Sequence, residues 1–256
     1  MNTSTKISAV LLGKLGEAVQ NSLPIEKIPA MEIVTNLPAL KEQLLRVPSL
    51  QEEVVLLVTE QEELTTTQLA ELLQQRQAAN FFTIVITVAT NNLERQQEIL
   101  ALVDAMIVLP TTELVSPALD RESVNAICQT MAYLANLIKE ALQGGMNVDF
   151  EDVKTVMRGS GASSVGFARA FGEERASQVT QKLMSTPFMK PGQLTNASKV
   201  LIQISSGANA ELEMDELTEI TDAIQEACGD ECEVIFGHSQ QDSLGQEIEV
   251  FLLATH

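Results

Sequence analysis

The sequence predicts an α/β protein with a Rossmann-like parallel-sheet N-terminal domain, a long central helix and an α+β C-terminal domain. Over residues 1–110, apolar runs alternate with helical patterns. Such alternation specifies a mostly parallel sheet with helices on both faces. An uninterrupted helical pattern follows over about residues 119–142, and a second series of short strands and helices comes after it. These observations define the fold class.

Strands and helices are expected to alternate through the N-terminal part. The predicted strands are Ile7–Leu12, Glu32–Thr35, Val54–Val58, Phe82–Ala89 and Ala105–Leu109. The predicted helices are Glu17–Leu23, Pro38–Val47, a segment that ends at about Gln77, and Leu93–Leu102. The Val54–Val58 run has no polar interruption, which is typical of a strand buried on both faces of a parallel sheet.

The long helix is predicted from the spacing of its apolar residues. These are Val124, Ile127, Met131, Leu134, Ile138 and Leu142, which fall along one helical face. Gly144-Gly145 is typical of a helix C-terminus.

The C-terminal part is predicted to be α+β. Its expected helices are Asp149–Met157, Glu173–Met184 and Glu213–Cys228, and its expected strands are Val200–Ser205, Glu231–Gly237 and Gln246–Ala254. Arg158–Ser164 is expected to be a loop or the start of an irregular strand. The last two strands, joined by Ser239–Gly245, are expected to form an antiparallel hairpin. The predicted domains are residues 1–118, 119–143 and 144–256.

Composition excludes some classes of function. The formal net charge of −19 argues against binding nucleic acid or an anionic membrane directly. Hydrophobic residues make up 45% of the chain, yet no apolar run approaches the length of a membrane span. The N-terminus does not have the shape of a signal peptide, so a cytoplasmic location is expected.

The three cysteines are Cys128, Cys228 and Cys232. Together with His238, the last two do not provide the number and spacing of ligands that a metal site needs. We therefore expect buried thiols in a reducing compartment, and no metal site.

The stretch between the long helix and the C-terminal part carries Asn147, Asp149 and Asp152 at the spacing Asn-x-Asp-x-x-Asp. At the start of a helix, the two carboxylates would project from nearly the same face, where they could hold a cation or orient a water. Helix capping, with Asp149 as the N-cap and a further acid in the first turn, explains the same residues. Both interpretations remain open on spacing alone.

Several ordered motifs resemble the FtsZ family of tubulin-like proteins. Gly145–Met157 resembles its synergy loop, and Gly172-Glu173-Glu174-Arg175-Ala176 resembles its Gly-Glu-Asp-Arg-Ala motif. Further matching segments are Lys199–Gly207, Leu212–Ile224, Val234–Gly237 and Val250–Thr255. The resemblance covers most of residues 105–256 and is much weaker before them.

The resemblance implies a tubulin/FtsZ-like fold and head-to-tail filaments. In the family, the synergy loop of one subunit completes the GTPase site of its neighbour, and its acids position the attacking water. Those roles would fall on Asn147, Asp149 and Asp152, acting in trans. The family's disordered C-terminal tail has no counterpart after the last strand, so membrane attachment would need another protein.

The expected phosphate-binding residues depart from the family pattern. A phosphate cradle needs glycines, because its backbone N–H groups must approach the phosphates closely. The family's glycine-rich loop is replaced by Thr59–Thr67, which has no glycine and contains three glutamates, Glu60, Glu62 and Glu63. Thr65, Thr66 and Thr67 could bind an anion at the helix start, but N-capping is the preferred interpretation.

The remaining nucleotide contacts are also reduced. The first phosphate turn keeps only Gly13 and Gly16. Near the sugar site Glu94 remains, but Glu98 stands where an Arg is expected. Ile127 falls where the family has the aspartate that reads guanine. The sequence therefore predicts loss of GTP binding and no cofactor, with GTP as the alternative.

Three functions follow from these observations. The first is an FtsZ-like pseudo-GTPase that binds FtsZ or another FtsZ-like subunit through its synergy loop, capping or modulating filaments. The second is a divergent GTPase that forms its own homopolymer. The third is a homodimeric scaffold unrelated to cell division, on which Asp149 and Asp152 serve only as helix caps.

Overall fold

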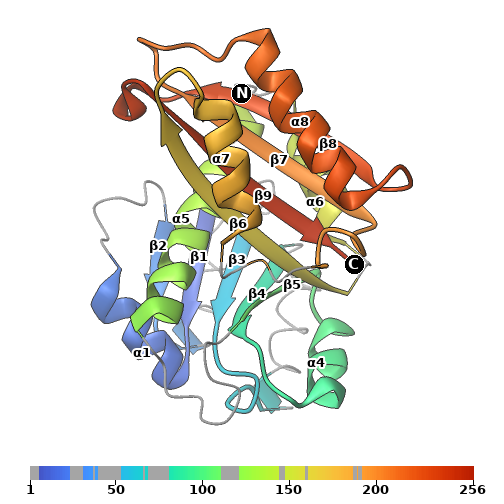
Figure 1. Cartoon of the computed structure of the whole chain (residues 1–256). Helices are drawn as coiled ribbons and strands as arrows, with labels where there is room; N and C mark the ends of the chain where they lie inside the picture. The colour runs from blue at the N-terminus through green and yellow to red at the C-terminus, as the bar shows by residue number, and fades with distance from the viewer. Residues whose placement is uncertain are drawn as a thin grey trace. The chain divides into compact units, whose positions relative to one another are not determined.

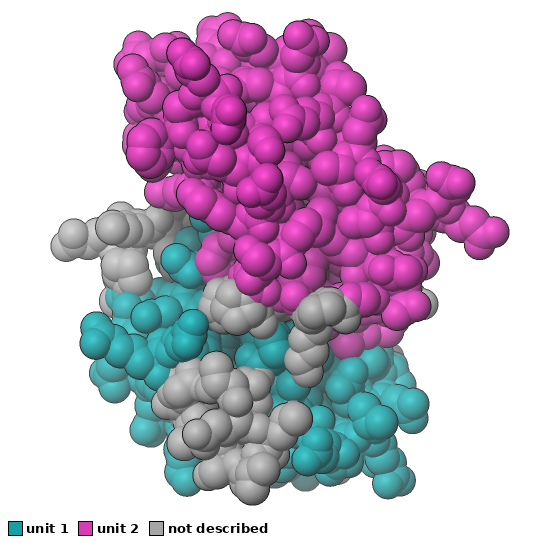
Figure 2. Space-filling view, viewed as in Figure 1, with its two compact units in different colours: residues 1–136 teal, residues 137–256 magenta. Residues whose placement is uncertain are grey.

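The computed structural model describes residues 6–23, 31–36, 38–39, 53–65, 67–68, 81–110, 121–143, 148–158, 161–186, 189 and 192–256 (Figure 1). The chain divides into two compact units, Met1–Asn136 and Leu137–His256, coloured teal and magenta in Figure 2.

Unit 1 contains a five-stranded parallel sheet in the order β2-β1-β3-β4-β5. The strands are β1 (Lys6–Leu11), β2 (Met31–Val34), β3 (Glu53–Val58), β4 (Phe82–Val88) and β5 (Ala105–Leu109). All five strands were expected from the sequence. Val54–Val58 are completely buried, as their unbroken apolar run predicts for a strand with a partner on each side.

Two shorter helices of unit 1 are α1 (Gly13–Ser22) and α4 (Leu93–Leu100). Helix α1 begins four residues before the predicted start, directly after β1. The predicted helices over Pro38–Val47 and up to about Gln77 lie mostly outside the described residues, as does Gly144-Gly145.

The long helix α5 spans Arg121–Gln143. Val124, Ile127, Met131, Leu134 and Ile138 are buried, which confirms the predicted apolar face. The boundary between the two compact units falls inside this helix, between Asn136 and Leu137. The division into residues 1–118, 119–143 and 144–256 stays a prediction.

Unit 2 contains four strands in the order β6-β9-β7-β8. They are β6 (Ala162–Phe171), β7 (Lys199–Ser206), β8 (Glu233–Gln240) and β9 (Glu247–Thr255), and a 3-10 turn, η2 (Asp242–Leu244), precedes β9. The helices are α6 (Phe150–Met157), α7 (Arg175–Met184) and α8 (Met214–Cys228). Helices α7 and α8 and strands β6, β7 and β9 are labelled in Figure 1, and their apolar side chains share one core.

The predicted hairpin of the last two strands is wrong. Strand β8 pairs in parallel with β7, and β9 lies between β6 and β7, antiparallel to both. Residues 248–255 of β9 are all buried, as a central strand requires, whereas β8, at the edge of the order, has only Gly237 and Ser239 buried. Burial of the more apolar strand therefore overrides the tendency of neighbouring strands to pair.

The segment around Arg158–Ser164 was also incompletely predicted. A ten-residue strand, β6, begins at Ala162. Its small residues resemble a loop in the sequence but serve close packing in the fold. A Cβ atom on Gly166 would lie 3.0 Å from a methyl carbon of Leu183 on α7, so glycine lets the helix approach the sheet.

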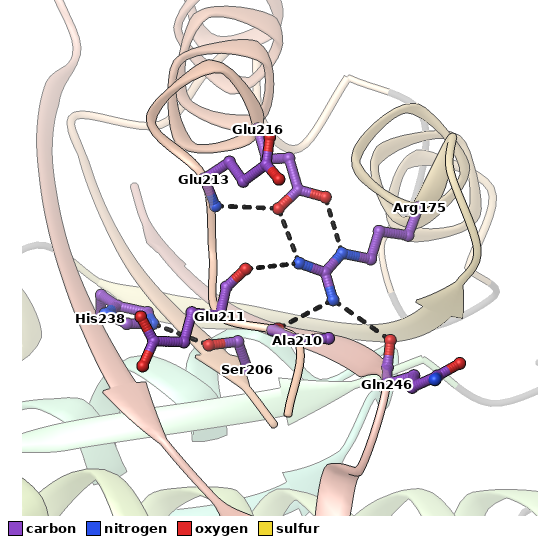
Figure 3. A network of polar contacts seen from close by, with 8 residues as sticks. All are labelled: Arg175, Ser206, Ala210, Glu211, Glu213, Glu216, His238 and Gln246. Atoms are coloured by element: carbon purple, nitrogen blue, oxygen red, sulfur yellow. Dashed lines mark hydrogen bonds and ion pairs between the residues drawn. The ribbon is translucent and has the colours of Figure 1, made fainter. Parts of the chain in front are cut away.

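A buried arginine joins α7 to α8 in unit 2 (Figure 3). Only 6% of Arg175 is exposed, and its guanidinium donates two hydrogen bonds to the carboxylate of Glu216, at 2.6 and 2.7 Å. The remaining N–H groups donate to the backbone carbonyls of Ala210, Glu211 and Gln246, at 2.8 to 3.2 Å. All five N–H donors of the guanidinium are thereby used.

The pair also shifts the pKa values of its two groups. The hydrogen bonds from Arg175 hold the pKa of the Glu216 carboxyl below its ordinary value, and those to Glu216 raise the pKa of Arg175. Because the folded pKa of Glu216 is depressed, its stabilising contribution is complete above the unfolded value, about 4.3, and is lost as the pH falls through the folded value.

Replacing Arg175 tests this network. Arg175→Lys keeps the charge but cannot form the five-bond pattern, so we expect it to lower the free energy of unfolding by about 1–3 kcal/mol. Urea denaturation followed by circular dichroism measures the change, and the acid side of the stability profile should become flatter.

The matched control is Lys199→Ala, which removes the more exposed ion pair of Lys199 with Glu233. A pair of that kind contributes at most about 1 kcal/mol. Equal losses in the two variants would contradict the role assigned to Arg175.

Candidate functional site

The carboxyl ends of the parallel strands in unit 1 form the edge at which α/β sheets usually bind ligands. The backbone hydrogen bonds continue past the strand ends here, from Leu12 N–H to the Val58 carbonyl (2.9 Å) and from Thr59 N–H to the Ile86 carbonyl (3.3 Å). They fix the loops that follow β1 and β3 beside each other. This edge carries Gly13, Gly16 and the glutamate-rich loop.

The first turn of α1 depends on two glycines. Gly13 has a φ of +64°, in the left-handed region that favours glycine. A Cβ atom on Gly16 would lie 2.5 Å from the carbonyl carbon of Leu11, so glycine is needed where the helix turns back onto β1. Both residues kept from the expected phosphate turn therefore have a structural reason to be glycine.

The carboxylate of Glu63 occupies the space directly above Gly13. A Cβ atom on Gly13 would lie 1.2 Å from Glu63 Oε2. The same oxygen accepts a hydrogen bond from the Lys14 N–H at 3.2 Å. N–H groups in the first turn of a helix have no carbonyl partner within the helix, and the helix dipole favours an anion there. The chain thus supplies its own anion at this helix start.

Gln61 and Arg95, which were not predicted from the sequence, hold the glutamate-rich loop in place through hydrogen bonds. Gln61 is completely buried and donates to the Val88 carbonyl at 3.3 Å. Arg95, on α4, donates to the carbonyl oxygens of Gln61 (3.4 Å) and Leu64. In the sequence, Gln61 is only a polar residue between glutamates, and Arg95 is only a basic residue beside Glu94. Neither pattern predicts a contact between residues some 30 positions apart.

The glutamates of the loop interact with one another. Burial and a hydrogen bond with the Glu63 carboxyl raise the pKa of Glu60, and the negative charges of Glu63 and Glu62 raise it further. The Lys14 ammonium opposes this shift. The loop concentrates negative charge at the start of α1.

The threonines after the loop act as helix caps where they are described. Thr65 N–H donates to Gln68 Oε1 at 2.8 Å, and Gln68 N–H donates to Thr65 Oγ1 at 3.2 Å. This reciprocal pair is a capping box, so the capping interpretation of Thr65 is confirmed. Thr67 is exposed in the same helical start, and Thr66 lies outside the described residues.

The two sugar-site candidates lie on α4. Glu94 is exposed in its first turn, while Glu98 forms an ion pair with Arg95.

Asp149 and Asp152 form a capping box at the start of α6 in unit 2. Asp152 N–H donates to Asp149 Oδ1 at 2.9 Å, and Asp149 N–H donates to Asp152 Oδ2 at 3.0 Å. The capping interpretation is therefore confirmed for both acids. The second oxygen of each carboxylate takes no part in this box. Asn147 lies outside the described residues.

The cysteines are buried, as predicted, and are not in disulfides. Burial raises the pKa of Cys128 to about 11 and that of Cys232 to about 12, which makes their thiols poor nucleophiles at neutral pH. Among the described residues, no three or more His, Cys, Asp and Glu side chains form a group that could hold a metal ion. No helix within the described ranges has the length and apolarity needed to span a membrane.

Comparison with known proteins identifies the C-terminal part. Residues 161–256 match the model of the FtsZ family C-terminal domain. The match begins at β6 and includes the rest of unit 2.

Solved structures resemble the whole chain at low sequence identity. An empty FtsZ dimer from M. jannaschii has 17% identity and a TM-score of 0.70, with 100% of this chain and 89% of that chain covered. CetZ from Methanosaeta thermophila has 15% identity and a TM-score of 0.66, with coverage of 98% and 86%. TubZ from Bacillus thuringiensis, in GDP-form protofilaments, has 10% identity and a TM-score of 0.63, with coverage of 98% and 83%.

At these identities the solved structures show the fold, and the domain match extends the likeness to sequence. The chain therefore has the FtsZ/tubulin-like fold, and its residues 161–256 match the C-terminal domain of the FtsZ family.

Proposed function

We propose that this FtsZ-like protein has lost GTP binding and acts by associating with an FtsZ-type subunit, or with another copy of itself. Its association face would carry Asp149 and Asp152 at the start of α6. The observation that carries the first half of the proposal is the Glu63 carboxylate above Gly13. An internal anion stands where an FtsZ-like protein would need to receive a phosphate.

The residues at the start of α1 do not fit the phosphate groups of a nucleoside triphosphate. A phosphate oxygen that approached the Lys14 N–H would meet the Glu63 carboxylate. At an effective dielectric of 20, two like charges about 4 Å apart repel by about 4 kcal/mol. A helix N-terminus contributes only about 0.3–2 kcal/mol to anion binding. Repulsion therefore exceeds attraction at this helix start.

The base side of the expected pocket is equally unsuited. Ile127, at the position where the family resemblance implies a guanine-reading aspartate, is a completely buried apolar residue of α5. It has no donor or acceptor for a base edge. The loss of a polar group there supports the same proposal from a separate element.

The second half of the proposal rests on the retained C-terminal domain. Residues 161–256 match the FtsZ family C-terminal domain, whereas the first hundred residues resemble the family much more weakly. In the Asp149–Asp152 box, one oxygen of each carboxylate is used for capping, and the other remains outside the box. Capping and the positioning of a water in a partner's site are therefore compatible. A chain that binds a filament through the face with Asp149 and Asp152, but offers no nucleotide pocket to the next subunit, would cap or modulate that filament.

The alternative of an active GTPase draws on the solved relatives. CetZ2 from Haloferax volcanii was solved as a GTPγS-bound protofilament, and CetZ1 from the same organism as a GDP-bound monomer. A homopolymer of this chain would need Glu63 to move away from α1 when nucleotide binds. In the scaffold alternative, Asp149 and Asp152 do nothing beyond the capping that they already perform.

Direct binding of GTP separates the first two functions. We expect isothermal titration calorimetry of the full chain with GTP and Mg²⁺ to give no saturable heat at micromolar nucleotide, because of the carboxylate repulsion. Binding of GTP with micromolar affinity would contradict the proposal and favour the homopolymer.

Sedimentation with a GTP-hydrolysing FtsZ tests the association. We expect substoichiometric amounts of this chain to change the amount of FtsZ polymer or its rate of GTP turnover, since each bound chain offers no pocket for the next subunit. The chain alone, with GTP, should stay in the supernatant. An unchanged FtsZ polymer yield and turnover would count against the proposal.

The carboxylates themselves are tested by Asp149→Asn combined with Asp152→Asn. Asparagine caps helices about as well as aspartate, so the free energy of unfolding should change by less than about 1 kcal/mol. The effect on FtsZ turnover should nevertheless be lost, because the amide cannot orient a water as a carboxylate does. Asp215→Asn, at an exposed position of α8, is a control for the loss of a single surface carboxylate. A double variant that acts on FtsZ like the unmodified chain would show that the two acids serve only as helix caps.

A further inference from the structure

We propose that the outer edge of β8 binds an extended segment of a basic partner protein, which adds one further strand to the sheet of unit 2. We call the side of β8 that faces away from β7 the β8 edge. This interaction uses a different element from the Asp149–Asp152 face of the proposed function, and it needs neither nucleotide nor FtsZ.

The backbone of β8 has a row of hydrogen-bonding groups on its outer side. Strand β8 ends the strand order, and its one strand neighbour is β7. The N–H groups of Glu233 and Gln241 donate to the carbonyls of Ser198 (3.1 Å) and Ser206 (2.9 Å), so the odd-numbered residues direct their backbone groups towards β7. Because successive residues of a strand direct these groups to opposite edges, the even-numbered residues direct theirs outward. These residues are Val234, Phe236, His238 and Gln240.

The outward groups are not used elsewhere in the fold. No backbone hydrogen bond joins these four residues to another part of the chain that the structure describes. An added strand could therefore pair with the β8 edge without displacing any contact of β8 with β7.

The β8 edge lacks the features that usually protect an edge strand. Natural edge strands are very short, or carry Lys, Pro or a bulge. Strand β8 has eight residues, none of them Lys or Pro, and its register with β7 continues through all eight without a bulge. Phe236 is 43% exposed near its centre, and Val234 and Ile235 beside it are half-buried. A strand laid alongside would cover this apolar centre.

The charge around the β8 edge determines which segment fits it. Asp230 and Glu231 are exposed directly before β8. Glu219, Asp222 and Glu226 are exposed on α8, which packs against the same apolar core as β8. The surroundings of the edge are therefore acidic.

No basic residues balance these acids in the C-terminal stretch. Lys199 pairs with Glu233 at 3.0 Å, and residues 200–256 contain no Lys or Arg. Pairing of two β8 edges would bring the like charges of two copies together. Lys or Arg side chains at the ends of an added strand would instead meet opposite charge. The β8 edge thus fits a basic strand better than a second copy of the chain.

Binding of synthetic peptides to the full chain tests the proposal. The probe has alternating valine and threonine at its centre and two lysines at each end, and fluorescence anisotropy follows its binding. We expect saturable binding that weakens as the salt concentration rises, because salt screens exposed charges. A peptide with glutamate in place of lysine should bind at least about tenfold more weakly. A lysine probe with N-methylated central amides should not bind, since it cannot donate to the outward carbonyls.

The peptide results separate charge from strand pairing. Equal binding of the N-methylated probe would mean that charge attraction alone acts, and would overturn the added strand. Equal binding of the glutamate peptide would overturn the basic partner, and no saturable binding of the lysine probe would overturn both.

Two variants at one position test the backbone of the β8 edge. Phe236→Pro removes one outward N–H but keeps the hydrogen bonds to β7, and proline is tolerated on an edge strand in such a position. It should abolish binding of the lysine probe. Phe236→Thr removes the exposed ring and keeps the N–H, so its affinity should fall by no more than about fivefold. Urea denaturation checks that the proline variant is folded, and the N-methylated probe tests the same pairing on the unmodified chain. Unchanged binding in Phe236→Pro would exclude the β8 edge.

The acids before β8 are tested by Asp230→Asn combined with Glu231→Gln. This double variant should bind the lysine probe about two- to tenfold more weakly. Its matched control is Glu173→Gln combined with Glu174→Gln, two exposed acids that follow β6 at the other end of the order β6-β9-β7-β8. Equal losses in the two double variants would mean that only the overall charge of the chain matters, which contradicts a site at β8.

Analytical ultracentrifugation distinguishes a second copy from a basic partner. We expect the unmodified chain and Phe236→Pro to sediment alike. A dimer of the unmodified chain that Phe236→Pro converts to a monomer would assign the β8 edge to self-pairing and overturn the basic partner. No GTP or FtsZ is present in these experiments, so their failure would leave the proposed function untouched.

Discussion

The backbone N–H groups in the first turn of α1 need a hydrogen-bond acceptor from elsewhere in unit 1. The first N–H groups of a helix need an acceptor, and the helix dipole makes a negatively charged acceptor favourable. In this chain that acceptor is Glu63, brought within 3.2 Å of the Lys14 N–H by a loop from the neighbouring strand. Gln61 and Arg95 hold the loop in place. The function that we propose needs no nucleotide, because the Glu63 carboxylate already accepts the hydrogen bond at the start of α1.

Much of the fold could be predicted because buried strands and helices have recognisable patterns of apolar residues in the sequence. Strands β1, β3, β4 and β5 and the apolar face of α5 are regular and largely apolar, so their patterns are unambiguous. The order of the C-terminal strands could not be predicted. Whether β9 pairs with β8 or enters between β6 and β7 depends on which strand has two apolar faces, and sequence proximity suggested the wrong partner.

The candidate site was predictable where the chemistry is local. The absence of glycine from Thr59–Thr67 and the capping pattern of Asp149 and Asp152 can both be seen within a few residues of sequence. The contact of Glu63 with Gly13 joins residues fifty positions apart, and the contact of Arg95 with Leu64 joins helix α4 to the glutamate-rich loop. Such contacts depend on loop conformation, which hydrophobic periodicity does not encode.

The burial of Ile127 has an evolutionary consequence. Its side chain is sealed within unit 1, on the same helical face as Val124 and Met131. A carboxylate introduced there without a partner would be desolvated at a cost of several kcal/mol, a large fraction of the stability of an ordinary domain. If the proposed loss of GTP binding is correct, a variant with glycines restored in the loop would still lack a base-reading group, and introducing one first would endanger folding. Under that proposal, recovery of nucleotide binding would be opposed by the interior of the protein as much as by its surface.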